Sequence, residues 1–133
     1  MAMVLSDLKG LNTEKIIKMS LLHDWAESKI GDFMPDEITS EKKSELEEYA
    51  ITEILDDLPH KIKEDYYNIW DEYMEANSSE SRLVHELDKL EMALQAKIYE
   101  KDVDPEKIKP FIISAVEQIT DEDLKKILIQ IIQ

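Results

Sequence analysis

Cysteine is absent from the 133-residue sequence, and glycine and proline are scarce, with two and four residues respectively. Without cysteine, the chain has neither a disulfide framework nor a thiolate nucleophile. The scarcity of glycine and proline leaves few positions that would interrupt a helix. The length is a usual one for a single domain and is sufficient to bury an apolar core. We therefore expect one domain over residues 1–133 that needs no covalent cross-links.

Apolar residues recur at three- and four-residue spacing along almost the whole sequence, which is the pattern of amphipathic helices. A first short helix should end at Gly10, because glycine accepts the left-handed conformation that closes helices. The caps Asn12 or Thr13, Ser40 and Thr120, together with Pro105 at a first helical position, predict where later helices begin. The sequence thus predicts an all-α fold, a bundle of about six or seven helices.

Long apolar runs are also missing, since none approaches the roughly 18 residues that a membrane-spanning helix needs. The first residues do not resemble a secretory signal, and Met1 and Ala2 read as an addition before a native Met3. We therefore expect a soluble, cytoplasmic protein.

Negative charge is in large excess, with 31 acidic residues against 16 basic ones and a formal net charge of −15. Such a surface repels a nucleic-acid duplex and an anionic membrane, so neither is an expected partner. A small phosphorylated molecule could still bind where a divalent cation or a cationic pocket reverses the local potential. The charge therefore leaves phosphate chemistry open.

An imidazole and two carboxylates occur together in the stretch SLLHDWAE, residues 20–27. Glu27 follows His23 by four residues and Asp24 by three, so a helix places it on their side. This donor set suits a divalent ion such as Mn, Co, Zn or Mg, with further ligands from elsewhere. The alternative is a core histidine with two capping or surface acids.

A further carboxylate, Asp88, is flanked by Leu87 and Leu90 in the most apolar helix. A buried carboxylate is costly unless it is paired, hydrogen-bonded or bound to a metal. Asp88 is therefore a candidate metal ligand, and a structural ion pair with Lys89 or Arg82 is the alternative.

These motifs carry a resemblance to a known family. LLHDWAESKIGD at residues 21–32, followed by LDKLEMALQA at residues 87–96, resembles the HD-domain phosphohydrolases, and more narrowly the small HD proteins that act as 5′-deoxynucleotidases. The resemblance extends from about Met3 to Glu100. It implies His23 and Asp24 as paired metal ligands and Asp88 as the ligand from the later helix.

The resemblance further implies that Glu27 and Asp32 act near the reacting phosphate or its attacking water. Asp32 has a structural alternative, because aspartate often stabilises a turn such as the one after Gly31. The implied reaction is metal-assisted hydrolysis of a (deoxy)nucleoside monophosphate to a nucleoside and inorganic phosphate. A homodimer is the family expectation.

One family feature is missing. The family's first metal-binding histidine lies on a helix upstream of the HD pair, whereas no histidine precedes His23 in this sequence. We therefore expect an N-terminally shortened HD-like domain that holds its ion with fewer protein ligands; the alternatives are a relative that has become metal-poor and a different group in place of the missing histidine. The alternative function is a non-catalytic, HD-like helical binding protein.

Overall fold

The computed structural model describes residues 1–133 except 32 and 34–36. Over the described residues it contains seven α-helices and no strand, which confirms the predicted all-α fold. The described residues divide into two compact units, the first formed by residues 1–31, 33 and 38–84 and the second by residues 37 and 85–133. That the two units form the single predicted domain stays a prediction.

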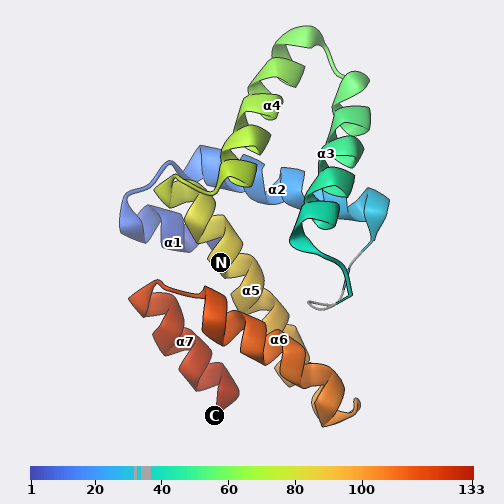
Figure 1. Ribbon diagram of the computed structural model, residues 1–133. Helices are drawn as coiled ribbons and strands as arrows, with labels where there is room; N and C mark the ends of the chain where they lie inside the picture. The colour runs from blue at the N-terminus through green and yellow to red at the C-terminus, as the bar shows by residue number, and fades with distance from the viewer. Residues whose placement is uncertain (32, 34–36) are drawn as a thin grey trace. The chain divides into compact units, whose positions relative to one another are not determined.

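The first unit contains α1 (Ala2–Lys9), α2 (Thr13–Ile30), α3 (Ser40–Asp56), α4 (His60–Glu75) and the start of α5 (Ser79–Tyr99). The helices α3 and α4 form an antiparallel pair, and both pack on α2 (Figure 1). Its core consists of apolar residues at helical spacing: Ile16, Met19, Leu22, Ala26, Ala50, Ile51, Leu55, Trp70 and Tyr73. This core fixes the side of α2 that faces α3 and α4.

Local capping explains where these helices begin and end. Gly10 adopts φ = 66° after α1, as predicted, and the amide of Leu11 donates to the carbonyl of Ser6. Asn12 caps α2 by accepting a hydrogen bond from the amide of Lys15 at 3.1 Å. The prediction that Ser40 caps α3 is wrong by one residue, because Thr39 accepts the hydrogen bond.

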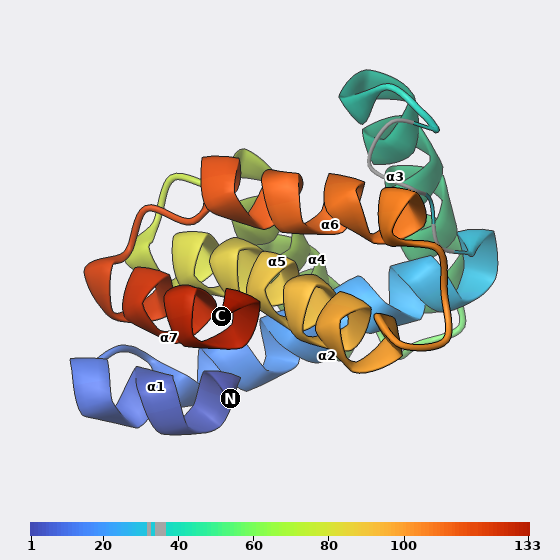
Figure 2. The same cartoon turned by 90° about the horizontal axis from the view of Figure 1, so that it is seen from below.

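The second unit contains the rest of α5, α6 (Pro105–Gln118) and α7 (Glu122–Ile132), and Figure 2 shows α6 and α7 side by side. Pro105 opens α6 as predicted. Asp121, rather than the predicted Thr120, caps α7. Thr120 instead donates its hydroxyl to the buried Glu86 at 2.6 Å, and the amide of Asp121 donates to the same carboxylate at 2.9 Å. Glu86 thus holds the α6–α7 turn against α5.

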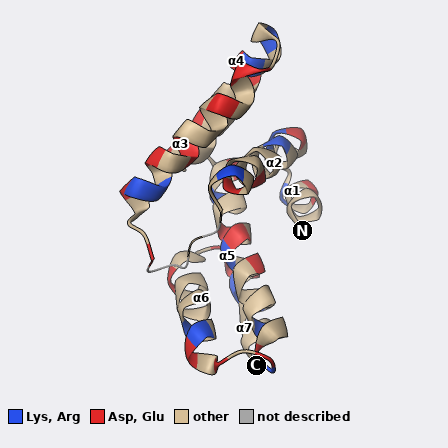
Figure 3. Ribbon diagram, turned by 90° about the vertical axis from the view of Figure 1, so that its right-hand side faces the viewer, with Lys and Arg blue, Asp and Glu red and all other residues tan. Residues whose placement is uncertain are grey.

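Charged residues are spread over the surfaces of the helices, and Figure 3 shows acidic positions along α3, α4 and α5. Within the described residues, no helix combines the length and the apolar character that crossing a bilayer requires.

Candidate metal centre

The centre of the site is His23 on α2, whose side chain is buried with 5% of the residue exposed. Glu27 lies one helical turn later, and its Oε1 atom is 3.3 Å from Nε2 of His23. The predicted proximity of these two side chains is therefore confirmed. An edge-on ring contact with Tyr73 of α4, at a centroid distance of 5.2 Å and an interplanar angle of 81°, restricts the plane of the imidazole.

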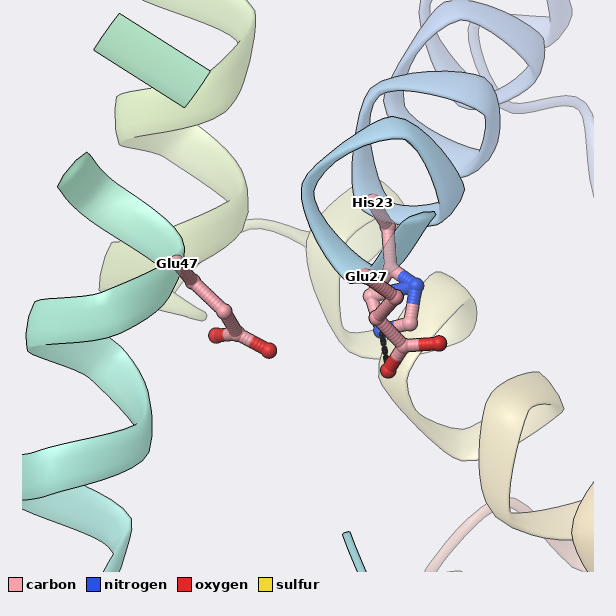
Figure 4. Close-up of side chains that lie close together, drawn as sticks. All are labelled: His23, Glu27 and Glu47. Carbon is pink, nitrogen blue, oxygen red and sulfur yellow. Dashed lines mark ion pairs between the residues drawn. The ribbon is translucent and has the colours of Figure 1, made fainter. Parts of the chain in front are cut away.

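A second carboxylate reaches this pair from α3. Glu47 is 6% exposed, and Figure 4 shows its side chain extending from α3 toward His23 and Glu27 on α2. One donor atom from each of the three residues lies within 4.8 Å of the other two. Two helices thus bring one nitrogen and two oxygen donors to the same place.

A hydrogen-bond network next to Glu47 holds α3 on α4. Glu48 accepts hydrogen bonds from the Tyr67 hydroxyl and, at 2.8 Å, from Nε1 of the fully buried Trp70. The bond to Glu48 raises the pKa of the Tyr67 phenol above its usual range, because it stabilises the protonated form. Since Glu47 directly precedes Glu48, this network also sets the position from which Glu47 reaches the histidine.

The ammonium group of Lys43 lies beside the two carboxylates. Nζ of Lys43 is 3.6 Å from Oε1 of Glu27 and 3.5 Å from Oε1 of Glu47. The Lys43 side chain is 30% exposed, and the side chains of Glu27 and Glu47 are 22% and 8% exposed. The ammonium group therefore balances part of the negative charge that the two glutamates bring together.

The donor set fits a divalent ion. Imidazole nitrogen and carboxylate oxygen bind such ions at about 2.0–2.2 Å, so two donors of one ion are at most about 4.4 Å apart. The separations of up to 4.8 Å exceed this limit by only a few tenths of an ångström. Small changes of side-chain rotamer are enough to close that difference.

Asp24, a predicted ligand, lies on the other side of the same imidazole. Its Oδ1 atom is 3.6 Å from Nδ1 of His23, which is longer than a hydrogen bond, and 75% of its side chain is exposed. His23 therefore has a carboxylate beside each ring nitrogen, Glu27 at Nε2 and Asp24 at Nδ1. The role of Asp24 as a ligand stays a prediction.

The other two predicted site residues are Asp32 and Asp88. Asp32 lies outside the described residues. Asp88 belongs to the second unit, where Oδ2 is 3.4 Å from Nζ of Lys89, as in the structural alternative. With a quarter of its side chain exposed, Asp88 is half-buried rather than fully buried as its flanking leucines suggested. Its role as a metal ligand stays a prediction.

Glu47 was missed because the sequence around it, SEKKSELEEY, reads as a solvated acidic face. That interpretation is wrong for Glu47, which is buried. Helical spacing carried a signal, since Glu47 precedes the buried residues Ala50 and Ile51 by three and four positions. An acid on the apolar side of a helix requires a partner, and here Lys43 pairs with Glu47 at 3.5 Å.

Several known proteins are similar to this chain in sequence. The HD domain family matches residues 1–131. Over 96 residues the chain is 46% identical to the 5′-deoxynucleotidase HDDC2 of Dictyostelium discoideum, covering 71% of this chain and 50% of that protein. The human 5′-deoxynucleotidase HDDC2 is 41% identical over 101 residues, covering 75% of this chain and 49% of the human protein.

A more distant relative is the 5′-deoxynucleotidase YGK1 of Saccharomyces cerevisiae, 30% identical over 129 residues, which cover 93% of this chain and 60% of the yeast protein. The chain therefore spans about half the length of the first two of these relatives and somewhat more of the third.

Proposed function

The chain belongs to the HD domain family, and from this membership we propose that it is a divalent-metal-dependent phosphohydrolase of (deoxy)nucleoside 5′-monophosphates. The observation that carries the proposal is the convergence of His23, Glu27 and Glu47 from α2 and α3. The names of the relatives support the substrate class, because three of them are called 5′-deoxynucleotidases.

In this proposal His23, Glu27 and Glu47 hold the ion, and Asp24 and Asp88 are the further ligands that the HD resemblance implies. A bound divalent ion polarises a phosphoryl oxygen and lowers the pKa of a coordinated water. Mn, Co, Mg and Zn all accept this mixture of nitrogen and oxygen donors, so the donor set alone does not select among them.

The protein's own contribution is to orient the donors and to handle the proton. Tyr73 and the flanking carboxylates fix the orientation of the His23 imidazole, so that the ring nitrogen that binds the ion points in a constant direction. Glu27 is the more exposed of the two clustered glutamates, which makes it the carboxylate that a water molecule and a substrate can reach. We assign the role of orienting the water and accepting its proton to Asp32 and to the carboxylate oxygen of Glu27 that does not bind the ion.

The proposal includes a cytoplasmic homodimer. Absence of cysteine fits a reducing compartment. Apolar side chains such as Ile129 on α7, which is 54% exposed, would be covered by a second copy. Light scattering coupled to size-exclusion chromatography distinguishes a dimer from a 15.5 kDa monomer.

The activity is tested by measuring phosphate release from a panel of nucleoside and deoxynucleoside 5′-monophosphates with Mn²⁺, Co²⁺ or Mg²⁺. We expect metal-dependent release that His23→Ala abolishes. The matched control is His60→Ala, because His60 is an exposed histidine at the start of α4. Equal release by the wild-type chain and His23→Ala would refute the assignment, as would the absence of release from a folded wild-type chain.

A further inference from the structure

The ammonium group of Lys43 contacts the same two carboxylates that converge on His23. It lies on α3, one turn before Glu47, and it reaches Oε1 of Glu47 at 3.5 Å and Oε1 of Glu27 on α2 at 3.6 Å. Most of its side chain is covered, since 30% is exposed. Lys43 is therefore an intramolecular bridge between the two helices that supply the donor set.

A divalent ion and this ammonium group compete for the same oxygens. An ion bound to either contacted oxygen lies about 2.0–2.2 Å from it. With the oxygens 3.5 and 3.6 Å from Nζ, such an ion would be less than about 6 Å from the ammonium nitrogen. Two positive centres at that distance repel each other, and half-buried charges are screened less by salt than exposed ones.

We propose that Lys43 is an exchangeable counter-cation: it pairs with Glu27 and Glu47 in the metal-free chain, and the divalent ion displaces it. The inference rests on the metal centre of the proposed function and adds a residue that acts against metal binding. Without Lys43, the two glutamates would face each other with like charge in a partly buried place, which is unfavourable. The lysine thus keeps the donors assembled before the ion arrives.

The exchange lowers the affinity for the ion, because binding must first break the two ion pairs of Lys43. Each partly exposed ion pair contributes only weakly to stability. Removing the ammonium group should therefore tighten metal binding by about three- to tenfold, and a tenfold change corresponds to about 1.4 kcal/mol. At the same time, the metal-free protein should lose stability.

The test is calorimetric titration of the full chain with Mn²⁺ at fixed ionic strength, for the wild type and Lys43→Met. Methionine keeps an unbranched apolar stem and removes the charge. Lys42→Met is the matched control, since it makes the same change of net charge one residue away, at a side chain that is 61% exposed and pairs with Glu45. We expect tighter binding in Lys43→Met and an affinity within about twofold of wild type in Lys42→Met.

A second readout is the melting temperature in the presence of a chelator, which should fall in Lys43→Met and stay near the wild-type value in Lys42→Met. Should Lys43→Met not fold, Lys43→Gln serves in the same titration. Affinity equal to or weaker than wild type in the Lys43 variant overturns this inference alone. Failure of every form to take up Mn²⁺ overturns the proposed metal centre together with it.

Discussion

Replacement of Glu47 by glutamine tests whether the acid from α3 is a metal ligand. The substitution keeps the size of the side chain and removes one of the two carboxylates in the cluster of His23, Glu27 and Glu47. Loss of a residue that merely supports a ligand typically weakens metal binding by about 10–100-fold. Loss of a direct ligand should cost at least as much, so we expect the dissociation constant to rise by about 100-fold.

The change in affinity can be read as a change in thermal stability. An ion present at about 100 times its dissociation constant stabilises the native state by ~2.7 kcal/mol, and after a 100-fold loss of affinity the same concentration supplies only ~0.4 kcal/mol. For a chain of this size, 1 kcal/mol shifts the melting temperature by roughly 4 °C. The metal-induced shift should therefore fall from about 10 °C in the wild type to about 2 °C in Glu47→Gln.

The assay is thermal unfolding followed by circular dichroism, with chelator and with Mn²⁺. Glu45→Gln is the control, because Glu45 is a 70% exposed glutamate on the same helix. Without metal, Glu47→Gln should melt within a few degrees of the wild type, since it loses the Lys43 ion pair but also the repulsion from Glu27. A full metal-induced shift in Glu47→Gln would refute its role as a ligand. A shift lost instead in Asp24→Asn would place the ion at Nδ1 of His23.

Two further predictions concern contacts between helices, one within each of the two units. Glu86→Ala leaves the Thr120 hydroxyl and one amide at the start of α7 without their acceptor. Chemical denaturation should show a loss of about 2–3 kcal/mol in the free energy of unfolding. The control Glu91→Ala, at an exposed glutamate on the same helix, should cost less than about 0.5 kcal/mol. Equal costs would contradict the structural role of Glu86. Tyr67 should ionise at a higher pH than an unperturbed tyrosine in an absorbance titration, and Glu48→Gln should lower its pKa. Because folding raises the pKa of Tyr67, the Tyr67–Glu48 hydrogen bond contributes to stability below the unfolded pKa near 10, and this contribution is lost as the pH rises through the folded pKa. An unchanged titration of Tyr67 in Glu48→Gln would contradict the role of Glu48 in raising this pKa.

The helices could be predicted from the sequence because local patterns determine them. Apolar spacing and the turn chemistry at Gly10 and Pro105 gave the number of helices and most of their limits. Two caps were displaced by one residue, from Ser40 to Thr39 and from Thr120 to Asp121. In each case two neighbouring residues were able to cap, and at α7 the Thr120 hydroxyl has a competing partner in Glu86.

Only the part of the site within one helix could be predicted in the same way. His23 and Glu27 are four residues apart on α2, so helical geometry alone places them together. Glu47 joins them through the packing of α3 on α2, which depends on contacts distant in sequence. The acidic surroundings of Glu47 concealed it, because charge runs on helices usually face solvent.

The charge of the cluster explains why a phosphorylated substrate would depend on the ion. With a neutral imidazole, Glu27, Glu47 and Lys43 leave the metal-free cluster with one net negative charge, in a chain of net charge −15. A divalent ion adds two positive charges at this place, with Lys43 still tethered nearby. Phosphate is therefore repelled less once the ion is bound, and its oxygens can be held by the ion itself. Metal binding would thus create the electrostatic attraction for the substrate as well as the Lewis acid for its hydrolysis.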